Sequence, residues 1–138
     1  MSAPLIDTHV WIWWMDGDER LPRRMRDALD DCARSTDGKD RTLPFLSDVS
    51  LWELALLVSS GRYEPFLELD EWLDISTQAV RVQPISAEIA AEFTRLPDTL
   101  HKDPADRLII ATCRALDLPI VTFDDRIRRS RLVKLWQV

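Results

Sequence analysis

The sequence is poor in cysteine and histidine. Its 138 residues include two cysteines, Cys32 and Cys113, and two histidines, His9 and His101. The cysteines lie far apart and have no ligand-like spacing to a histidine, so neither a disulfide framework nor a structural zinc site is predicted. We expect both thiols to be ordinary semi-buried side chains. Two histidines are also too few for a histidine-rich metal site.

Glycine and long apolar runs are scarce as well. None of the three glycines lies in a phosphate-cradling pattern, which disfavours a P-loop or a dinucleotide-binding fold. No apolar run approaches the ~20 residues that a membrane span requires, and the start of the chain lacks the basic and apolar regions of a secretory signal. We therefore expect a soluble, cytoplasmic protein with a single domain over residues 1–138.

The chain has no excess of positive charge. Its formal net charge is -6, which argues against a protein that grips nucleic acid by bulk electrostatics. Local contact remains open, because arginines gather in two groups. Each group is either a solvated helix face or a phosphate-binding patch; the groups are Arg20, Arg23, Arg24 and Arg26, and Arg126, Arg128, Arg129 and Arg131.

Apolar patterns predict strands that alternate with helices. Strands are expected within residues 5–11, most securely at Leu5 and Ile6, and at 43–49, 80–85, 120–123 and 132–136. Helices are expected at 21–33, 50–60, 66–79, 86–96 and 103–118 and just after Asp124, with a loop at 35–41. This alternation is typical of a parallel sheet covered on both faces. The predicted fold is a three-layer α/β/α sandwich with a central, mostly parallel sheet.

Four acidic residues fall where such a fold places its ligand site. Asp7 and Asp124 follow strands, whereas Glu53 and Asp106 each lie near the third position of a helix, and helices that follow a strand begin at the same edge of the sheet. In open α/β sheets, ligands bind outside the carboxyl ends of the strands. We therefore expect the four carboxylates to converge.

Structural explanations compete with this convergence. Glu53 would complete a capping box with Ser50, and Asp103 would cap the next helix and pair with Arg107 four residues later. Asp124 would form an Asx turn after its strand. The sequence alone leaves these alternatives open.

A cluster of carboxylates would need a cation. Two like charges about 4 Å apart repel by ~4 kcal/mol at an effective dielectric constant of 20, so the cluster would either take up protons or bind a metal ion. Carboxylate oxygens suit Mg²⁺ or Mn²⁺, and such an ion assists the hydrolysis of phosphate esters. His9 would touch the substrate or be packed, and the neighbouring tryptophans would stack on bases or form a buried face or dimer contact; they are Trp11, Trp13 and Trp14.

Four segments, in this order, resemble the PIN-domain ribonucleases, and within them the VapC type of toxin. They are LIDTHVWIWW at 5–14, SDVSLWELA at 47–55, HKDPADRLIIA at 101–111 and LPIVTFD at 118–124. The resemblance implies a parallel sheet between helices and an endoribonuclease that depends on Mg²⁺ or Mn²⁺. It also implies a homodimer and a cognate antitoxin whose tail occupies the active cleft.

The resemblance assigns roles to the acidic residues. Asp7 and Asp106 would hold the metal most directly, Glu53 would complete its shell or position water, and Asp124 would assist. Candidates for orienting these carboxylates or contacting the substrate are Thr8, His9, Arg107 and Thr122. The sequence departs from the family at Leu57, where a basic residue is often found, and at Ala105, where an aromatic one is. The alternative is an inactive interaction module of the same fold, in which the carboxylates are structural.

Overall fold

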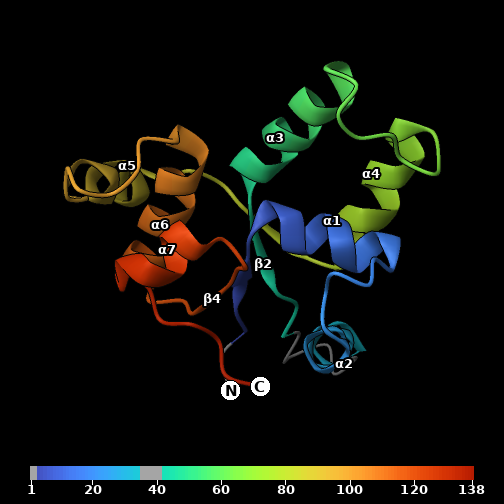
Figure 1. Ribbon diagram of the computed structural model, residues 1–138, viewed down its shortest axis with the longest axis horizontal. Coiled ribbons are helices and arrows are strands. Elements are labelled where there is room, and N and C mark those ends of the chain that lie inside the picture. The colour runs from blue at the N-terminus through green and yellow to red at the C-terminus, as the bar shows by residue number, and fades with distance from the viewer. Residues whose placement is uncertain (1–2, 35–41) are drawn as a thin grey trace.

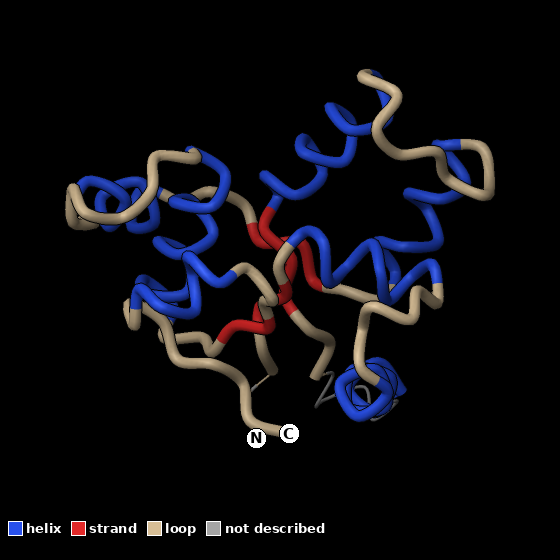
Figure 2. Tube along the Cα trace, viewed as in Figure 1, coloured by secondary structure: helices blue, strands red, loops and turns tan. Residues whose placement is uncertain are grey.

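The computed structural model describes residues 3–34 and 42–138. In these residues, four short strands form one parallel sheet between two groups of helices (Figures 1 and 2). The strand order is β3-β2-β1-β4, with β1 at Leu5–Ile6, β2 at Phe45–Ser47, β3 at Arg81–Gln83 and β4 at Ile120–Val121. The predicted three-layer α/β/α sandwich is confirmed.

Helices follow each strand and cover the sheet. In Figure 1, α5, α6 and α7 lie on one side of the sheet, and α1, α2 and α4 lie on the other, while α3 continues upward from the carboxyl end of β2. Their bounds are Thr8–Asp16 for α1, Arg23–Arg34 for α2, Asp48–Ser59 for α3, Leu69–Gln78 for α4, Ala87–Thr94 for α5, Pro104–Leu116 for α6 and Asp125–Ser130 for α7.

The central strands are buried on both faces. Successive side chains of a strand point to opposite sides, so Leu5 and Ile120 pack into one apolar cluster while Ile6 and Val121 pack into the other. The first cluster includes Ile89, Ile109 and Ile110 from α5 and α6, and the second includes Trp11, Leu54 and Trp72 from α1, α3 and α4. A parallel sheet with helices on both faces requires such continuous apolar strands.

One helix, α1, was not predicted, and another, α3, begins earlier than predicted. The strand expected within 5–11 ends at Ile6, because the Asp7 side chain accepts a hydrogen bond from the backbone N–H of Thr8 and caps α1. The helix expected from Ser50 begins at Asp48, because the Ser47 hydroxyl accepts from the backbone N–H of Val49 and is the cap. The predicted capping box between Ser50 and Glu53 is therefore wrong.

Other boundaries also differ from the prediction. The helix expected from residue 66 begins at Leu69. The final strand expected at 132–136 is reduced to one parallel bridge between Leu135 and Ile120. The helix caps predicted at Ser86 and Asp103 are both present. The predicted loop at 35–41 lies outside the described residues.

The remaining expectations concern cysteines and membranes. Cys113 is buried and Cys32 is half-buried, and both are free thiols, as predicted. Among the described residues, no helix is long and apolar enough to cross a membrane.

Candidate active site

Strand register brings Asp7 next to Thr122. Ile6 pairs with Val121 across β1 and β4, so the residues that follow them are neighbours. The Thr122 hydroxyl donates to Asp7 Oδ2 at 2.7 Å and accepts from the backbone N–H of Asp124 at 3.1 Å. Asp7 Oδ1 accepts from the backbone N–H of Thr8 at 2.8 Å. Asp7 is only 3% exposed, and its orientation is fixed from both sides.

A short chain of hydroxyl groups orients Glu53 on α3. The Thr8 hydroxyl donates to Glu53 Oε1 at 2.5 Å and lies 2.7 Å from the Ser50 hydroxyl. Because a threonine hydroxyl has a single proton, Ser50 must donate to Thr8. Ser50 therefore donates to Thr8, and Thr8 donates to Glu53. These two hydrogen bonds link the start of α1 to the first half of α3.

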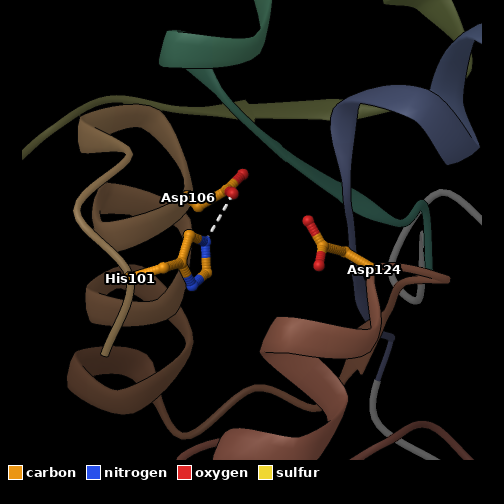
Figure 3. A group of neighbouring side chains, drawn as sticks. All are labelled: His101, Asp106 and Asp124. Atoms are coloured by element: carbon orange, nitrogen blue, oxygen red, sulfur yellow. Dashed lines mark hydrogen bonds and ion pairs between the residues drawn. The ribbon is translucent and has the colours of Figure 1, made fainter. Parts of the chain in front are cut away.

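Asp106 lies in the first turn of α6 and contacts His101. The backbone N–H of Asp106 donates to Asp103 Oδ1 at 3.0 Å, so Asp103 caps the helix. His101 Nε2 lies 2.7 Å from Asp106 Oδ2. Figure 3 shows this contact, with Asp124 facing it from the start of α7. The His101 ring therefore holds one oxygen of Asp106.

Asp124 caps α7 and pairs with an arginine. Its Oδ1 accepts from the backbone N–H of Arg126 at 2.9 Å, and its Oδ2 lies 2.9 Å from an Nη atom of Arg126. The same Nη atom is 3.5 Å from Asp106 Oδ2. The Arg126 guanidinium thus reaches both carboxylates.

All four predicted carboxylates line one cavity of about 260 Å³. They come from four segments that are distant in sequence and meet at the carboxyl edge of the sheet. The other walls of this cavity are Thr8, His9, Ile12, Trp13, Arg20, Leu57, Arg62 and Tyr63. The structure therefore assembles the predicted acidic set.

Burial and mutual repulsion raise the pKa values of two of these carboxyl groups. Burial, together with the charges of Asp7, Asp106 and Asp103, raises the pKa of Glu53 to about 7, against the opposing effect of the Thr8 hydrogen bond. Burial and the nearby carboxylates also raise the pKa of Asp106, although the His101 contact lowers it. The hydrogen bond from Arg126 lowers the pKa of Asp124. Without a cation, the cavity therefore favours the protonated forms of Glu53 and Asp106.

His9 and Trp13 form an aromatic wall of the cavity. The backbone N–H of Phe123 donates to His9 Nε2 at 3.0 Å, so the proton of the neutral ring is on Nδ1, 3.5 Å from Asp7 Oδ2. The His9 ring packs on Trp13 at a centroid distance of 4.9 Å, and the Arg20 guanidinium lies 4.9 Å from the Trp13 ring. Of the three neighbouring tryptophans, only Trp13 reaches the cavity, since Trp11 and Trp14 are buried in the core.

Arg107 is not part of the cavity. It is buried, and its guanidinium donates to the backbone carbonyls of Pro97, Leu100 and His101. The predicted ion pair between Asp103 and Arg107 is therefore wrong, because Arg107 points into the loop before α6 and satisfies its carbonyl groups.

Sequence reasoning did not assign several residues of this site, among them His101 and Arg126, which contact the carboxylates directly. His101 stands five residues before Asp106, and α6 begins between them. This spacing across the start of a helix is the sequence feature that could have indicated their contact. Arg126 stands two residues after Asp124. An arginine at this position can pair with an aspartate that caps the helix through an Asx-type turn.

The donor set fits a hard divalent cation. One ligand atom each from His101, Asp106 and Asp124 lies within 4.8 Å of the others, and Asp7 and Glu53 line the same cavity. Several carboxylate oxygens, some of them with raised pKa values, suit Mg²⁺ or Mn²⁺, which also retain water ligands. A bound cation would relieve the repulsion within the cluster.

The chain belongs to the PIN-domain family, since residues 5–131 match the PIN domain. The resemblance that the four sequence segments indicated is thereby confirmed. The chain is 30% identical over 131 residues to Ribonuclease VapC22 of Mycobacterium tuberculosis, and the aligned region covers 95% of this chain and 94% of the relative.

Solved structures share the fold. Similar chains occur in VapBC2 from Rickettsia felis bound to a promoter DNA fragment, with a TM-score of 0.73, 18% identity and 97% of both chains covered. DNA-bound VapBC from Salmonella typhimurium gives a TM-score of 0.69 and 15% identity, with 99% of this chain and 98% of that chain covered.

Proposed function

We propose that this protein is the toxin of a toxin–antitoxin pair, and that it hydrolyses RNA phosphodiester bonds with the help of Mg²⁺ or Mn²⁺. The observation that carries this proposal is the convergence of Asp7, Glu53, Asp106 and Asp124 on one cavity of a PIN-domain chain. The relative named Ribonuclease VapC22 supports the same activity.

Each carboxylate has a proposed role. Asp7 and Asp106 hold the metal most directly, and Asp124 assists them. The metal, when bound, activates water and stabilises charge on the phosphate. Glu53 completes the metal shell or positions the attacking water, and its raised pKa suits it to accept a proton from that water. Thr8 orients Oε1 of Glu53, and Thr122 orients Oδ2 of Asp7.

The cavity wall offers groups that suit an RNA strand. Trp13 and His9 present rings on which an unpaired base can stack. Arg20 and Arg62 line the same cavity and supply positive charge for the phosphate backbone. Arg62 compensates for the basic residue that is absent at Leu57, which lines the cavity as well.

We also propose a cognate antitoxin, a homodimer and a cytoplasmic location. A groove of about 570 Å³ between α3 and α6 shares Glu53 with the acidic cavity. Trp52 and Leu56 on its wall are 55% and 46% exposed, which suits an apolar segment of the antitoxin. Both similar solved structures are of VapBC bound to DNA, which supports an antitoxin partner.

Cleavage of total RNA tests the proposed activity. Purified wild-type protein is compared with Asp7→Asn in the presence of Mg²⁺, Mn²⁺ or EDTA, and Asp74→Asn on the exposed face of α4 is the matched control. We expect discrete products from the wild type and the control with metal only, and at least a ~100-fold loss for Asp7→Asn, the scale of a lost electrostatic group at an active site. Growth inhibition on expression should follow the same order.

The alternative is the inactive interaction module. A fully active Asp7→Asn protein would contradict a catalytic role for the carboxylates. If no RNA is cut with either metal while the folded protein binds its antitoxin, the interaction module is the better description.

A further inference from the structure

A second pocket lies on the other side of the acidic residues. Its volume is about 300 Å³, and its walls are parts of the segment before α6 and of α7. Three of its lining side chains are His101, Arg126 and Arg129, and no aspartate or glutamate lines it. The pocket is therefore basic, in contrast to the neighbouring cavity.

The two pockets share a wall. His101 lines the basic pocket and contacts Asp106, and Arg126 lines it and contacts Asp124. Both of these aspartates line the acidic cavity. His101 and Arg126 therefore separate the basic pocket from the carboxylates by one layer of side chains, and a ligand bound in the pocket lies next to the reaction site.

The pocket contains donors that the fold does not use. Within the described part of the chain, the side chains of Arg129 and Thr99 have no hydrogen-bond or ion-pair partner, and both are exposed. Arg126 is engaged by Asp124 but is itself exposed. Arg128, on the same helix, lies over the Phe123 ring and does not line the pocket. Of the two neighbouring arginines, Arg129 therefore lies at the pocket, whereas Arg128 lies against Phe123.

An anionic ligand with several acceptor oxygens suits this arrangement. A guanidinium matches a phosphate group through paired N–H donors, and a nearby hydroxyl adds one more donor. A strand of RNA that places its scissile phosphate among the metal ligands has to continue past the cavity, and its next phosphates carry the same charge.

We propose that this pocket, formed by Arg126, Arg129, Thr99 and His101, binds a backbone phosphate of the RNA strand beside the scissile one. This inference rests on the proposed ribonuclease function and adds a subsite to it. Arg129 is the main binding group, and Arg126 also holds Asp124. Since phosphate contacts position a strand without reading its bases, the pocket contributes affinity and register but no sequence preference.

Binding of a fluorescent single-stranded RNA oligonucleotide tests the proposal. Anisotropy titrations in EDTA, where no cleavage is expected, compare wild type, Arg129→Gln and the control Arg128→Gln. Both variants remove one charge from the same short helix. We expect Arg129→Gln to bind about three- to tenfold more weakly, and to lower the salt slope by about 0.7, the value for one contact to a single strand. Arg128→Gln should change both much less.

A neutral linkage in the RNA adds a sharper test. One methylphosphonate is placed at successive positions of an RNA that the protein cleaves. At one position, close to the cleaved bond, the neutral linkage should raise KM for wild type without a further effect on Arg129→Gln, while kcat changes little.

Three results would overturn the proposal. They are equal losses for Arg129→Gln and Arg128→Gln, a loss that depends on RNA sequence, and unchanged RNA binding accompanied by weaker antitoxin binding, which would assign the pocket to the protein partner. Failure of the wild type to cut any RNA would contradict the proposed function instead, and the anisotropy comparison would still decide whether the pocket binds phosphate.

Discussion

At the scale of single residues, one proton couples the two sides of the active site. Thr8 follows Asp7 in the chain, and its hydroxyl proton is directed to Glu53 Oε1 because Ser50 occupies its acceptor side. A displacement of the first turn of α1 would therefore move Asp7 and release Glu53 at the same time. The position of the proposed water-positioning group depends on that of the proposed metal ligand.

Glu53→Gln should stabilise the metal-free protein at alkaline pH. The pKa of Glu53 is raised from 4.5 to about 7 in the folded state, so the folded protein binds this proton more tightly than the unfolded chain. The resulting stability is complete below about pH 4.5 and is lost as the pH rises through 7. At pH 8, glutamine removes the buried charge and its repulsion by the neighbouring carboxylates, and we expect a gain of about 1–2 kcal/mol in the free energy of unfolding, against little change at pH 4.5.

Urea unfolding at pH 4.5 and pH 8 in EDTA measures this difference. Glu64→Gln, at an exposed position outside the cavity, is the matched control and should show no pH-dependent gain. Clear destabilisation by both Glu53→Gln and Asp106→Asn would instead favour structural carboxylates and the inactive module.

Residue types and spacing predicted the acidic set, and the family resemblance supplied Thr8 and Thr122 as orienting groups, but neither predicted the contacts of His101 and Arg126. Asp7, Glu53, Asp106 and Asp124 could be named because each follows a strand or opens a helix at the same sheet edge. His101 and Arg126 could not, because their contacts depend on the conformation of the loop before α6 and on how α7 turns back. Arg107 was misplaced for the same reason, since nothing local indicates that it enters that loop.

At the scale of elements, the start of α6 combines a helix cap with a charge. Asp103 caps the helix through Asp106 N, and its charge also contributes to the raised pKa values of Glu53 and Asp106. The two effects oppose each other, because the cap stabilises the helix while the charge repels its neighbours.

Asp103→Ala and Asp103→Asn separate these effects. Both variants remove the charge, but only asparagine can still accept the bond from Asp106 N. We expect Asp103→Ala to be about 1 kcal/mol less stable than Asp103→Asn in chemical unfolding. Equal stability of the two variants would show that the cap contributes little.

Sequence patterns also predicted the order of elements better than their starts. The helix α1 was missed because apolar residues follow Asp7 so closely that they resemble a strand. Val10, Trp11 and Trp14 are buried at helical spacing. This pattern can be told from that of a strand only once Asp7 is known to cap α1. For α3, Ser47 and Ser50 are both candidate caps. Ser47 is the cap, because its hydroxyl accepts from the backbone N–H of Val49. Local sequence could not decide this, because Ser50 is used in the contact with Thr8.

At the scale of the whole molecule, metal binding should be linked to folding. The unfolded chain separates the four carboxylates and cannot form the site, so a cation binds the native state and stabilises it. At a metal concentration 100 times its Kd, the expected gain is about 2.7 kcal/mol. Because Glu53 has to lose its proton, this gain should be larger at pH 8 than at pH 5.

Thermal melting with Mg²⁺ or Mn²⁺ checks the linkage. We expect Tm to rise by several °C with metal, to return on addition of EDTA, and to change much less in Asp7→Asn. Sodium chloride at equal ionic strength is the control for general screening. A rise in Tm that is equal for wild type, Asp7→Asn and the salt control would contradict a specific site.

The strands that support the site are only two or three residues long. Between Leu5, which is fixed in the core, and Asp7 there is one residue, and between Val121 and Asp124 there are two. One inserted or deleted codon in either segment would exchange the two faces of the strand and turn the carboxylate away from the edge. In the evolution of this gene, substitutions in these segments are therefore easier to accommodate than changes of length.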